Sequence, residues 1–205
     1  MSASCQNLPM AAAGLLLCGG ASRRMGEDKA RIRSGSHGKG PSLAQRAADI
    51  LREATSPVLE VGPGYSGLPR VAERPLGGGP LVALAAGAAE LFRVGWTGAA
   101  VVIATDMPML EVAVVEWLAG YPDSRTVVPV LGDVPQPLCA RYDRRALDSA
   151  IVLAEDGARS MRDLLSVVDH VLAGPEEWQA AGIEPRCFAD VDTPGDLAAY
   201  RSKAP

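Results

Sequence analysis

The sequence predicts an α/β fold: a single three-layer α/β/α domain built around a mostly parallel sheet. Its 205 residues suit one domain of ordinary or slightly large size. Short apolar runs, typical of strands buried on both faces, alternate with segments whose apolar residues follow a helical spacing. The 22 glycines and 16 prolines fall between these segments as turn and loop residues. Strands that alternate with helices in this way form βαβ units with parallel strands.

The N-terminal half begins with a strand over residues 11–18, a continuous apolar run. A helix is expected over residues 43–54, where apolar side chains recur on one face, and Ser42 with Gln45 forms a capping box before it. A second helix begins at Pro80, because proline is favoured at the first helical position. Two further apolar runs predict strands over residues 57–61 and 99–104.

The C-terminal half continues the alternation. Thr193 is expected to cap a last helix, and Asp196, three residues later, is best explained by the same cap. The predicted strands of this half cover residues 126–130, 138–142 and 188–191, and the other predicted helices cover residues 144–154 and 160–167.

Composition and charge exclude several classes of protein. The formal net charge is −4, from 20 Lys and Arg against 24 Asp and Glu. Proteins that bind nucleic-acid backbones are usually basic, so we expect no nucleic-acid partner. No apolar run approaches the ~18 residues that span a bilayer, so we expect no membrane association. The domain is expected over residues 10–202, after a flexible N-terminal segment over residues 1–9.

The cysteines indicate a reducing compartment. Cys5, Cys18, Cys139 and Cys187 lie far apart and form no CxxC pair. This spacing disfavours a disulfide scaffold and a zinc ribbon, so a cytoplasmic location is expected.

The loop after the first strand, residues 17–29, carries the clearest chemical pattern. Its three glycines allow backbone N–H groups to turn toward a ligand. Arg23, Arg24 and Lys29 place three positive charges beside them, which suits the triphosphate of a nucleotide. The order of residues is neither GxxxxGK[ST] nor GxGxxG. The alternative is a simple turn whose arginines point into solvent.

Acidic residues follow two of the predicted strands. Asp106 comes just after strand 99–104, and the carboxyl ends of parallel strands meet at one edge, where ligands of such sheets bind. A carboxylate there can hold Mg²⁺, which prefers oxygen ligands and bridges phosphates. Asp190 and Asp192 point the same way on an extended segment and could face the same crevice. The alternative for Asp106 is a residue that ends the strand in a turn.

The loop at residues 17–29 resembles the signature L-x-G-G-x-S-R-R-M-G-x-D-K of nucleotidyltransferases that make the dinucleotide form of molybdenum cofactor, the MobA-like family. It is most similar to the guanylyltransferase branch, with Cys18 where that branch commonly has alanine. The resemblance continues along most of the chain, and its further motifs are Gly-Pro-Leu at 79–81, Ala-Thr-Asp-Met-Pro at 104–108, Gln-Pro-Leu at 136–138 and the segment 190–197.

The resemblance implies a Rossmann-like sheet of the nucleotide-diphospho-sugar transferase type and a set of site residues. Catalytic roles are implied for Arg23, Lys29 and Asp106. A metal role is implied for Asp106, with Asp190 or Asp192 as weaker candidates. Gln136 is implied to contact the acceptor, or else is an ordinary loop amide. The implied nucleotide-binding residues are Leu17, Cys18, Gly19, Gly20, Arg23, Arg24, Lys29, Asp106, Gly62 and Arg74.

The chain departs from the family pattern at three places. The family often has Asn-x-Asn where this sequence has Asp190 and Asp192. The family's acidic residue before Gly-Pro-Leu aligns with Arg74, and Glu73 is its neighbour. The contact after the second strand falls near Gly62, which can offer only its backbone.

The resemblance implies transfer of GMP from GTP to the terminal phosphate of molybdopterin or molybdenum cofactor, with release of pyrophosphate. Mg²⁺ is the implied cofactor, and GTP and molybdopterin are the implied partners. A molybdoenzyme or a cofactor chaperone is left open as a further partner. Two alternatives remain at this point. One is a CTP-dependent molybdopterin cytidylyltransferase or another small-molecule nucleotidyltransferase of the same fold, and the other is a non-catalytic nucleotide-binding module that regulates a partner.

Overall fold

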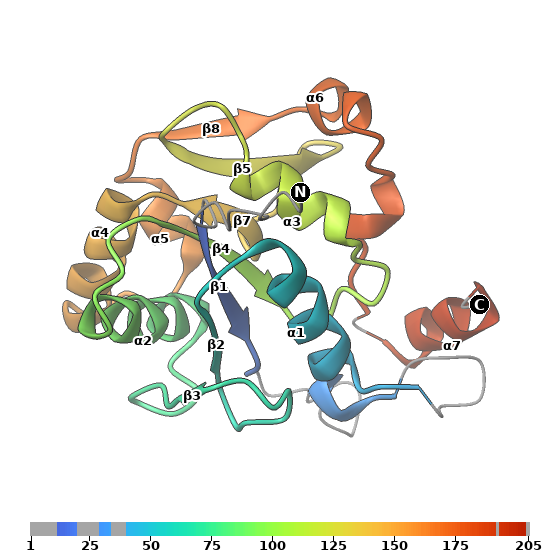
Figure 1. Ribbon diagram of the computed structural model, residues 1–205, viewed down its shortest axis with the longest axis horizontal. Helices are drawn as coiled ribbons and strands as arrows, with labels where there is room; N and C mark the ends of the chain where they lie inside the picture. The colour runs from blue at the N-terminus through green and yellow to red at the C-terminus, as the bar shows by residue number, and fades with distance from the viewer. Residues whose placement is uncertain (1–11, 20–28, 34–39, 192, 204–205) are drawn as a thin grey trace, which may run out of the picture.

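The computed structural model describes residues 12–19, 29–33, 40–191 and 193–203. A central sheet lies between two layers of helices (Figure 1), so the predicted three-layer α/β/α fold is confirmed. The strands are β1 (Ala12–Leu17), β2 (Val58–Val61), β3 (Arg70–Val71), β4 (Ala99–Ala104), β5 (Thr126–Leu131), β6 (Val134–Pro135), β7 (Cys139–Tyr142) and β8 (His170–Ala173). The helices are α1 (Leu43–Ala54), α2 (Pro80–Arg93), α3 (Val112–Ala119), α4 (Arg144–Glu155), α5 (Met161–Leu165), α6 (Pro175–Ala180) and α7 (Pro194–Lys203), with 3-10 turns η1 (Lys29–Arg31) and η2 (Pro185–Phe188).

β1 lies in the middle of the parallel part of the sheet. It pairs in parallel with β2 and with β4, and its last residue, Leu17, lies opposite both Val61 and Ala104. The strand order is β3-β2-β1-β4-β7-β5-β6, and β8 pairs in parallel with β5. β7 runs antiparallel to its neighbours β4 and β5. The start of β7 therefore meets the carboxyl ends of β1, β2 and β4 at one edge of the sheet.

Each face of the sheet is covered by its own apolar core. Residues of α1 and α3 cover one face, and residues of α2 and α4 cover the other, as the two helical layers in Figure 1 show. Gly87 of α2 faces the sheet, and a Cβ there would lie 2.9 Å from Cγ2 of Val61. The small residues of α2 thus allow close packing of helix on sheet.

The local signals for the first helices are confirmed. Ser42 and Gln45 form a reciprocal capping box at the start of α1, and Pro80 is the first residue of α2. At the C-terminal end, the backbone N–H of Asp196 donates to Oγ1 of Thr193, which confirms the expected cap of α7.

The strand predicted over residues 188–191 is wrong. Residues Pro185–Phe188 form the 3-10 turn η2, in which the Ala189 amide donates to the Arg186 carbonyl. The buried Phe188 ring packs edge-on against Trp178, so its burial comes from a side-chain contact and not from a strand. The sequence interpretation also missed β3, β6, β8, α3 and α6, and it made α5 too long.

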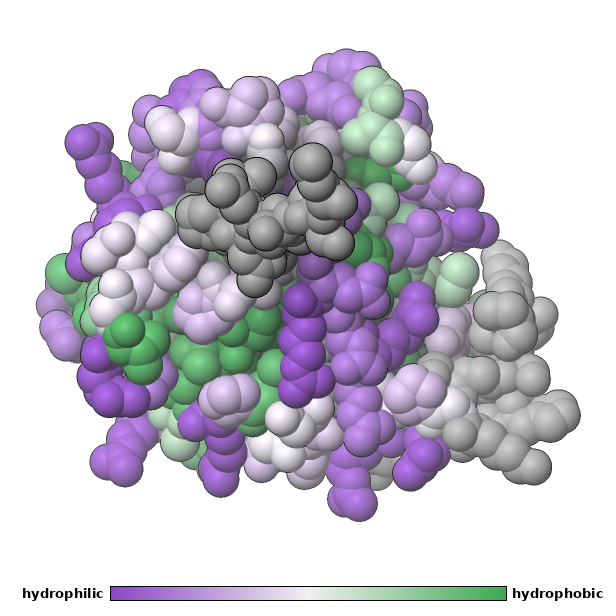
Figure 2. All heavy atoms as spheres, viewed as in Figure 1, coloured by the Kyte–Doolittle hydropathy of each residue, from purple (hydrophilic) through white to green (hydrophobic). Residues whose placement is uncertain are grey.

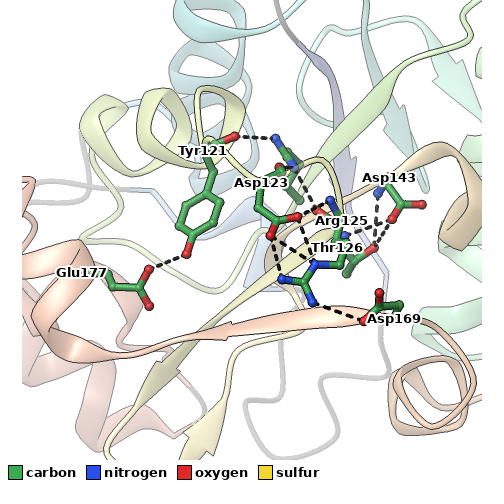
Figure 3. A network of polar contacts seen from close by, with 8 residues as sticks. Tyr121, Asp123, Arg125, Thr126, Asp143, Asp169 and Glu177 are labelled. Atoms are coloured by element: carbon green, nitrogen blue, oxygen red, sulfur yellow. Dashed lines mark hydrogen bonds and ion pairs between the residues drawn. The ribbon is translucent and has the colours of Figure 1, made fainter.

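A polar network joins the loop between α3 and β5 to β7, at the edge where β4 and β5 begin (Figure 3). The guanidinium of Arg141 on β7 donates to the backbone carbonyls of Tyr121, Asp123 and Arg125. Burial of the ring and a hydrogen bond to Glu177 raise the pKa of Tyr121 to about 12. This network ties the loop before β5 to the sheet at the edge opposite Asp106.

Hydrophilic residues cover most of the outline of the face seen in Figure 2, with hydrophobic residues between them. Within the described residues, no helix has the length and apolar character needed to cross a membrane. Cys18, Cys139 and Cys187 are all buried.

Candidate active site

Lys29 and Asp106 meet at the carboxyl end of the sheet. β1 leads into Cys18 and Gly19, while β4 next to it leads into Asp106. η1 returns the chain to this edge, and Nζ of Lys29 lies 3.7 Å from Oδ2 of Asp106. The Lys29 side chain is 16% exposed and that of Asp106 is 29% exposed, so both can be reached by a ligand. The structure therefore brings together two of the three predicted catalytic residues.

The acidic side chain beside the glycine loop belongs to Glu73. Its Oε1 accepts a hydrogen bond from the Gly77 amide, and a Cβ built on Gly19 would lie 3.4 Å from the same oxygen. Glu73 is buried, whereas its neighbour Arg74 is exposed. The carboxylate next to the loop is thus one position earlier than the alignment with Arg74 suggested.

Gly62 lies directly against the backbone of the glycine loop. Its amide donates to the Val71 carbonyl, while the Cys18 amide donates to the Val61 carbonyl. A Cβ on Gly62 would overlap the carbonyl oxygen of Cys18, and the φ of Gly62 is +149°. Gly62 therefore fixes the position of Cys18 through close backbone contact, and its predicted backbone contact with the nucleotide stays a prediction.

Glu60 of β2 holds the loop that follows Gly62. Its fully buried carboxylate accepts hydrogen bonds from the backbone amides of Gly64, Tyr65 and Ser66 and from the hydroxyl of Ser66. Burial alone would raise the pKa of Glu60, but the bonds from Ser66, Gly64 and Tyr65 outweigh it, so the pKa is lowered. The carboxylate is thus stabilised in its charged form.

Because the pKa of Glu60 is lower in the folded protein, we expect the charged group to stabilise the fold fully above about pH 4.5, the ordinary pKa of a glutamate. This stability is lost as the pH falls through the lower, folded pKa. Glu60→Gln should lower the free energy of unfolding by about 2 kcal/mol at pH 7, because charge-assisted hydrogen bonds are lost. It should also remove the part of the pH dependence of stability that comes from Glu60. Urea unfolding at several pH values measures both effects. Glu53→Gln, on the exposed side of α1, is the control, and equal behaviour of the two variants would contradict the prediction.

The segment before α7 approaches the same edge. The Val191 amide donates to the backbone carbonyl of Asp106 at 2.8 Å, and the exposed Asp190 is the residue just before Val191. Asp192, Gly20, Arg23 and Arg24 lie outside the described residues, so their predicted roles stay predictions.

Gln136 lies at the edge as well, since the Ala104 amide donates to the Leu138 carbonyl at 2.9 Å. Its side-chain amide donates to the carbonyl of Val134 in β6, two residues earlier. This bond fits the loop-amide interpretation, and the predicted acceptor contact stays a prediction.

Among the described residues, no group of three or more His, Cys, Asp or Glu could hold a metal ion. Mg²⁺ does not need such a group, because it is usually held by one or two carboxylates together with substrate phosphates and water. The partly exposed carboxylate of Asp106 fits that requirement.

Comparison with known proteins identifies the family of this chain. The MobA-like NTP transferase domain matches residues 14–172. The chain is 32% identical to a probable molybdenum cofactor guanylyltransferase of Chloroflexus aggregans, over 92% of each chain. It is 34% identical to one of Opitutus terrae, over 83% of this chain and 89% of the relative.

Solved structures share the fold. The crystal structure of molybdopterin-guanine dinucleotide biosynthesis protein A from Archaeoglobus fulgidus superposes with a TM-score of 0.72 at 23% identity, over 93% of this chain and 97% of that one. The 2-C-methyl-D-erythritol 4-phosphate cytidylyltransferase of Thermus thermophilus gives 0.64 at 13% identity, over 93% and 98%.

The family match covers most of the chain and includes Gly19, Gly62 and Asp106. It favours an enzyme over the alternative of a non-catalytic binding module. This chain therefore belongs to the MobA-like NTP transferase family and is a nucleotidyltransferase.

Proposed function

We propose that this enzyme transfers GMP from GTP to the terminal phosphate of molybdopterin, or of its molybdenum-loaded form, and releases pyrophosphate. The observation that carries the proposal is the pairing of Lys29 with Asp106 where the glycine loop leaves β1. In the proposed reaction, the ammonium group of Lys29 binds phosphate oxygens and the neighbouring carboxylate of Asp106 would hold a metal. The names of the curated relatives supply the choice of nucleotide and acceptor.

This reaction needs little acid–base chemistry from the protein. The attacking phosphate monoester has a second pKa near 6, so it is mostly a dianion at neutral pH. In-line positioning and neutralisation of charge at the α-phosphorus then carry the catalysis.

The chain's own residues divide these tasks. Backbone amides at Gly19 and the Lys29 ammonium hold the triphosphate and the departing pyrophosphate. Gly62 keeps the loop backbone in place through its contact with Cys18. Asp106 would hold Mg²⁺, with Asp190 or Asp192 as a second oxygen donor. When bound, the ion would polarise the α-phosphate oxygens.

Pyrophosphate release tests the proposal directly. The purified protein is mixed with Mg²⁺, molybdopterin and each of the four nucleoside triphosphates in turn. Release with GTP alone supports the proposal. Release with CTP alone would move the activity to cytidylyl transfer, and no release with any nucleotide would contradict transfer to molybdopterin.

Lys29→Ala should weaken GTP binding and turnover by about 10- to 150-fold, because one charge-assisted contact contributes roughly 1.5–3 kcal/mol. Titration with GTP and steady-state pyrophosphate release measure the loss. Arg31→Ala removes a positive charge from the same turn, where Arg31 is exposed and stacks over Tyr65, and should leave both quantities nearly unchanged. Wild-type binding and rate in folded Lys29→Ala would remove Lys29 from the site.

A further inference from the structure

Arg46 on α1 reaches across to the turn that carries Asp106. Its Nε donates to the Pro108 carbonyl at 3.1 Å, and its Nη2 donates to the Leu110 carbonyl at 2.9 Å. The side chain is half-buried between the helix and the turn. A guanidinium presents its donors in one rigid plane, so a single side chain fixes two carbonyls at once.

Two other backbone oxygens of this turn are bonded to backbone amides. The Asp106 carbonyl accepts from Val191, and the Met107 carbonyl accepts from the Leu110 amide at 3.2 Å. Met107 and Leu110 point into the core, where they are 7% and 0% exposed. Arg46 thus adds side-chain bonds to two further carbonyls of the turn, those of Pro108 and Leu110.

α1 has stabilising features of its own besides Arg46. The helix has a capping box at Ser42 and an apolar face that includes Ala47, Ile50 and Leu51. The partners of Arg46 lie 62 and 64 residues further along the chain, two and four positions after Asp106. The side-chain bonds of Arg46 therefore stabilise the turn beside Asp106 and not α1 itself.

We propose that Arg46 is a positioning residue for this enzyme: it fixes the turn over residues 105–110 so that the carboxylate of Asp106 stays beside Lys29, ready to hold a divalent cation. The inference rests on the proposed function, because it assigns Arg46 to the metal carboxylate of that reaction. Partners that orient a metal ligand typically contribute about 10- to 100-fold to metal affinity or activity.

The test compares Arg46→Ala and Arg46→Lys with Arg52→Ala in the full-length protein. Arg52 is an exposed arginine of α1 that donates to the Gly67 carbonyl in a different loop, so it is a matched control. Hydrogen exchange reports on the amides of residues 105–110. Mn²⁺ binding is followed by electron paramagnetic resonance in the presence of a GTP analogue with a methylene bridge between the α- and β-phosphates.

In Arg46→Ala we expect exchange in the turn to be at least about 10-fold faster and Mn²⁺ affinity to be about 10- to 100-fold weaker. Arg46→Lys should fall between Arg46→Ala and wild type, because an ammonium bonds one carbonyl well but not two. Arg52→Ala should match wild type in both measurements. The dependence of kcat on Mg²⁺ should shift to higher concentration in the Arg46 variants, with less change in KM for GTP.

The inference fails if folded Arg46→Ala shows wild-type exchange in the turn, or a loosened turn with wild-type Mn²⁺ affinity. If Arg46→Ala does not fold, Arg46→Lys decides by the same two measurements. Failure of the proposed function looks different: the wild-type protein releases no pyrophosphate with GTP, while exchange in the turn still shows whether Arg46 holds it.

Discussion

Asp106→Asn is expected to lower kcat by about 1000-fold while GTP binding stays measurable. Asparagine keeps the size of the side chain and one oxygen acceptor but removes the charge that would anchor Mg²⁺. Loss of metal polarisation at the α-phosphate costs several kcal/mol in the transition state, and about 4 kcal/mol corresponds to that factor. The loss should therefore appear in kcat more than in KM.

Steady-state pyrophosphate release over a Mg²⁺ titration measures this effect, with folding followed by circular dichroism. GTP binding persists because the variant loses the carboxylate that pairs with Lys29 but keeps the lysine itself. Asp133→Asn, on the exposed β5–β6 turn, is a matched control for removal of one aspartate charge. Near wild-type kcat in Asp106→Asn would make Asp106 a turn residue and pass the metal role to Asp190 and Asp192.

Gly62→Ala is expected to destabilise the fold by about 4 kcal/mol. The φ of Gly62, +149°, lies in a region that residues with a side chain rarely adopt, and the added carbon would overlap the Cys18 carbonyl. Backbone strain and overpacking each cost about 1–3 kcal/mol. Relief of the overlap must push β2 away from β1 or displace the start of the glycine loop, so nucleotide binding should fall as well.

Gly67→Ala separates the effect of backbone strain from the effect of overlap with the Cys18 carbonyl. Gly67 also has a positive φ, +76°, but no atom lies within 4 Å of the position that its Cβ would take. Gly67→Ala should therefore lower the free energy of unfolding only through strain of the backbone at positive φ, by about 1–2 kcal/mol. Urea unfolding of both variants gives the comparison. Equal losses would show that the contact with Cys18 contributes nothing.

The parts of the fold that the sequence predicts well are those with a local signal. Strands 12–17 and 99–104 are continuous apolar runs, and α1 has both an amphipathic face and its own cap at Ser42. α3 was missed because its sequence is apolar on most sides, rich in β-branched valine, and lacks a side-chain cap. The strand predicted at 188–191 was wrong because burial of Phe188 by Trp178 looks, in sequence, like burial in a sheet.

In the candidate site, too, residues within a local sequence motif were predicted, and a residue whose partners are distant in sequence was not. Lys29 and Asp106 were predicted because each follows a recognisable segment whose end must reach the carboxyl edge of the sheet. Arg46 gave no comparable signal, since an arginine on an amphipathic helix is most often a solvated side chain. Its partners are backbone carbonyls far along the chain. Because every residue has a backbone carbonyl, the residue types in the sequence do not identify such partners. Only the packing of α1 beside the turn reveals the contact.

The reversed direction of β7 has a mechanical consequence. The parallel strands β3, β2, β1 and β4 form one block that carries Gly19 and Asp106, and β5, β6 and β8 form another. β7 lies between the two blocks. It pairs with β4 at four positions and with β5 at the pair Val127 and Arg141. The hydrogen bonds from Arg141 to three carbonyls of the loop before β5 hold the two blocks together at one end of β7. A hinge motion between the blocks would therefore open at the other end, where Gln136 faces the edge that holds Asp106.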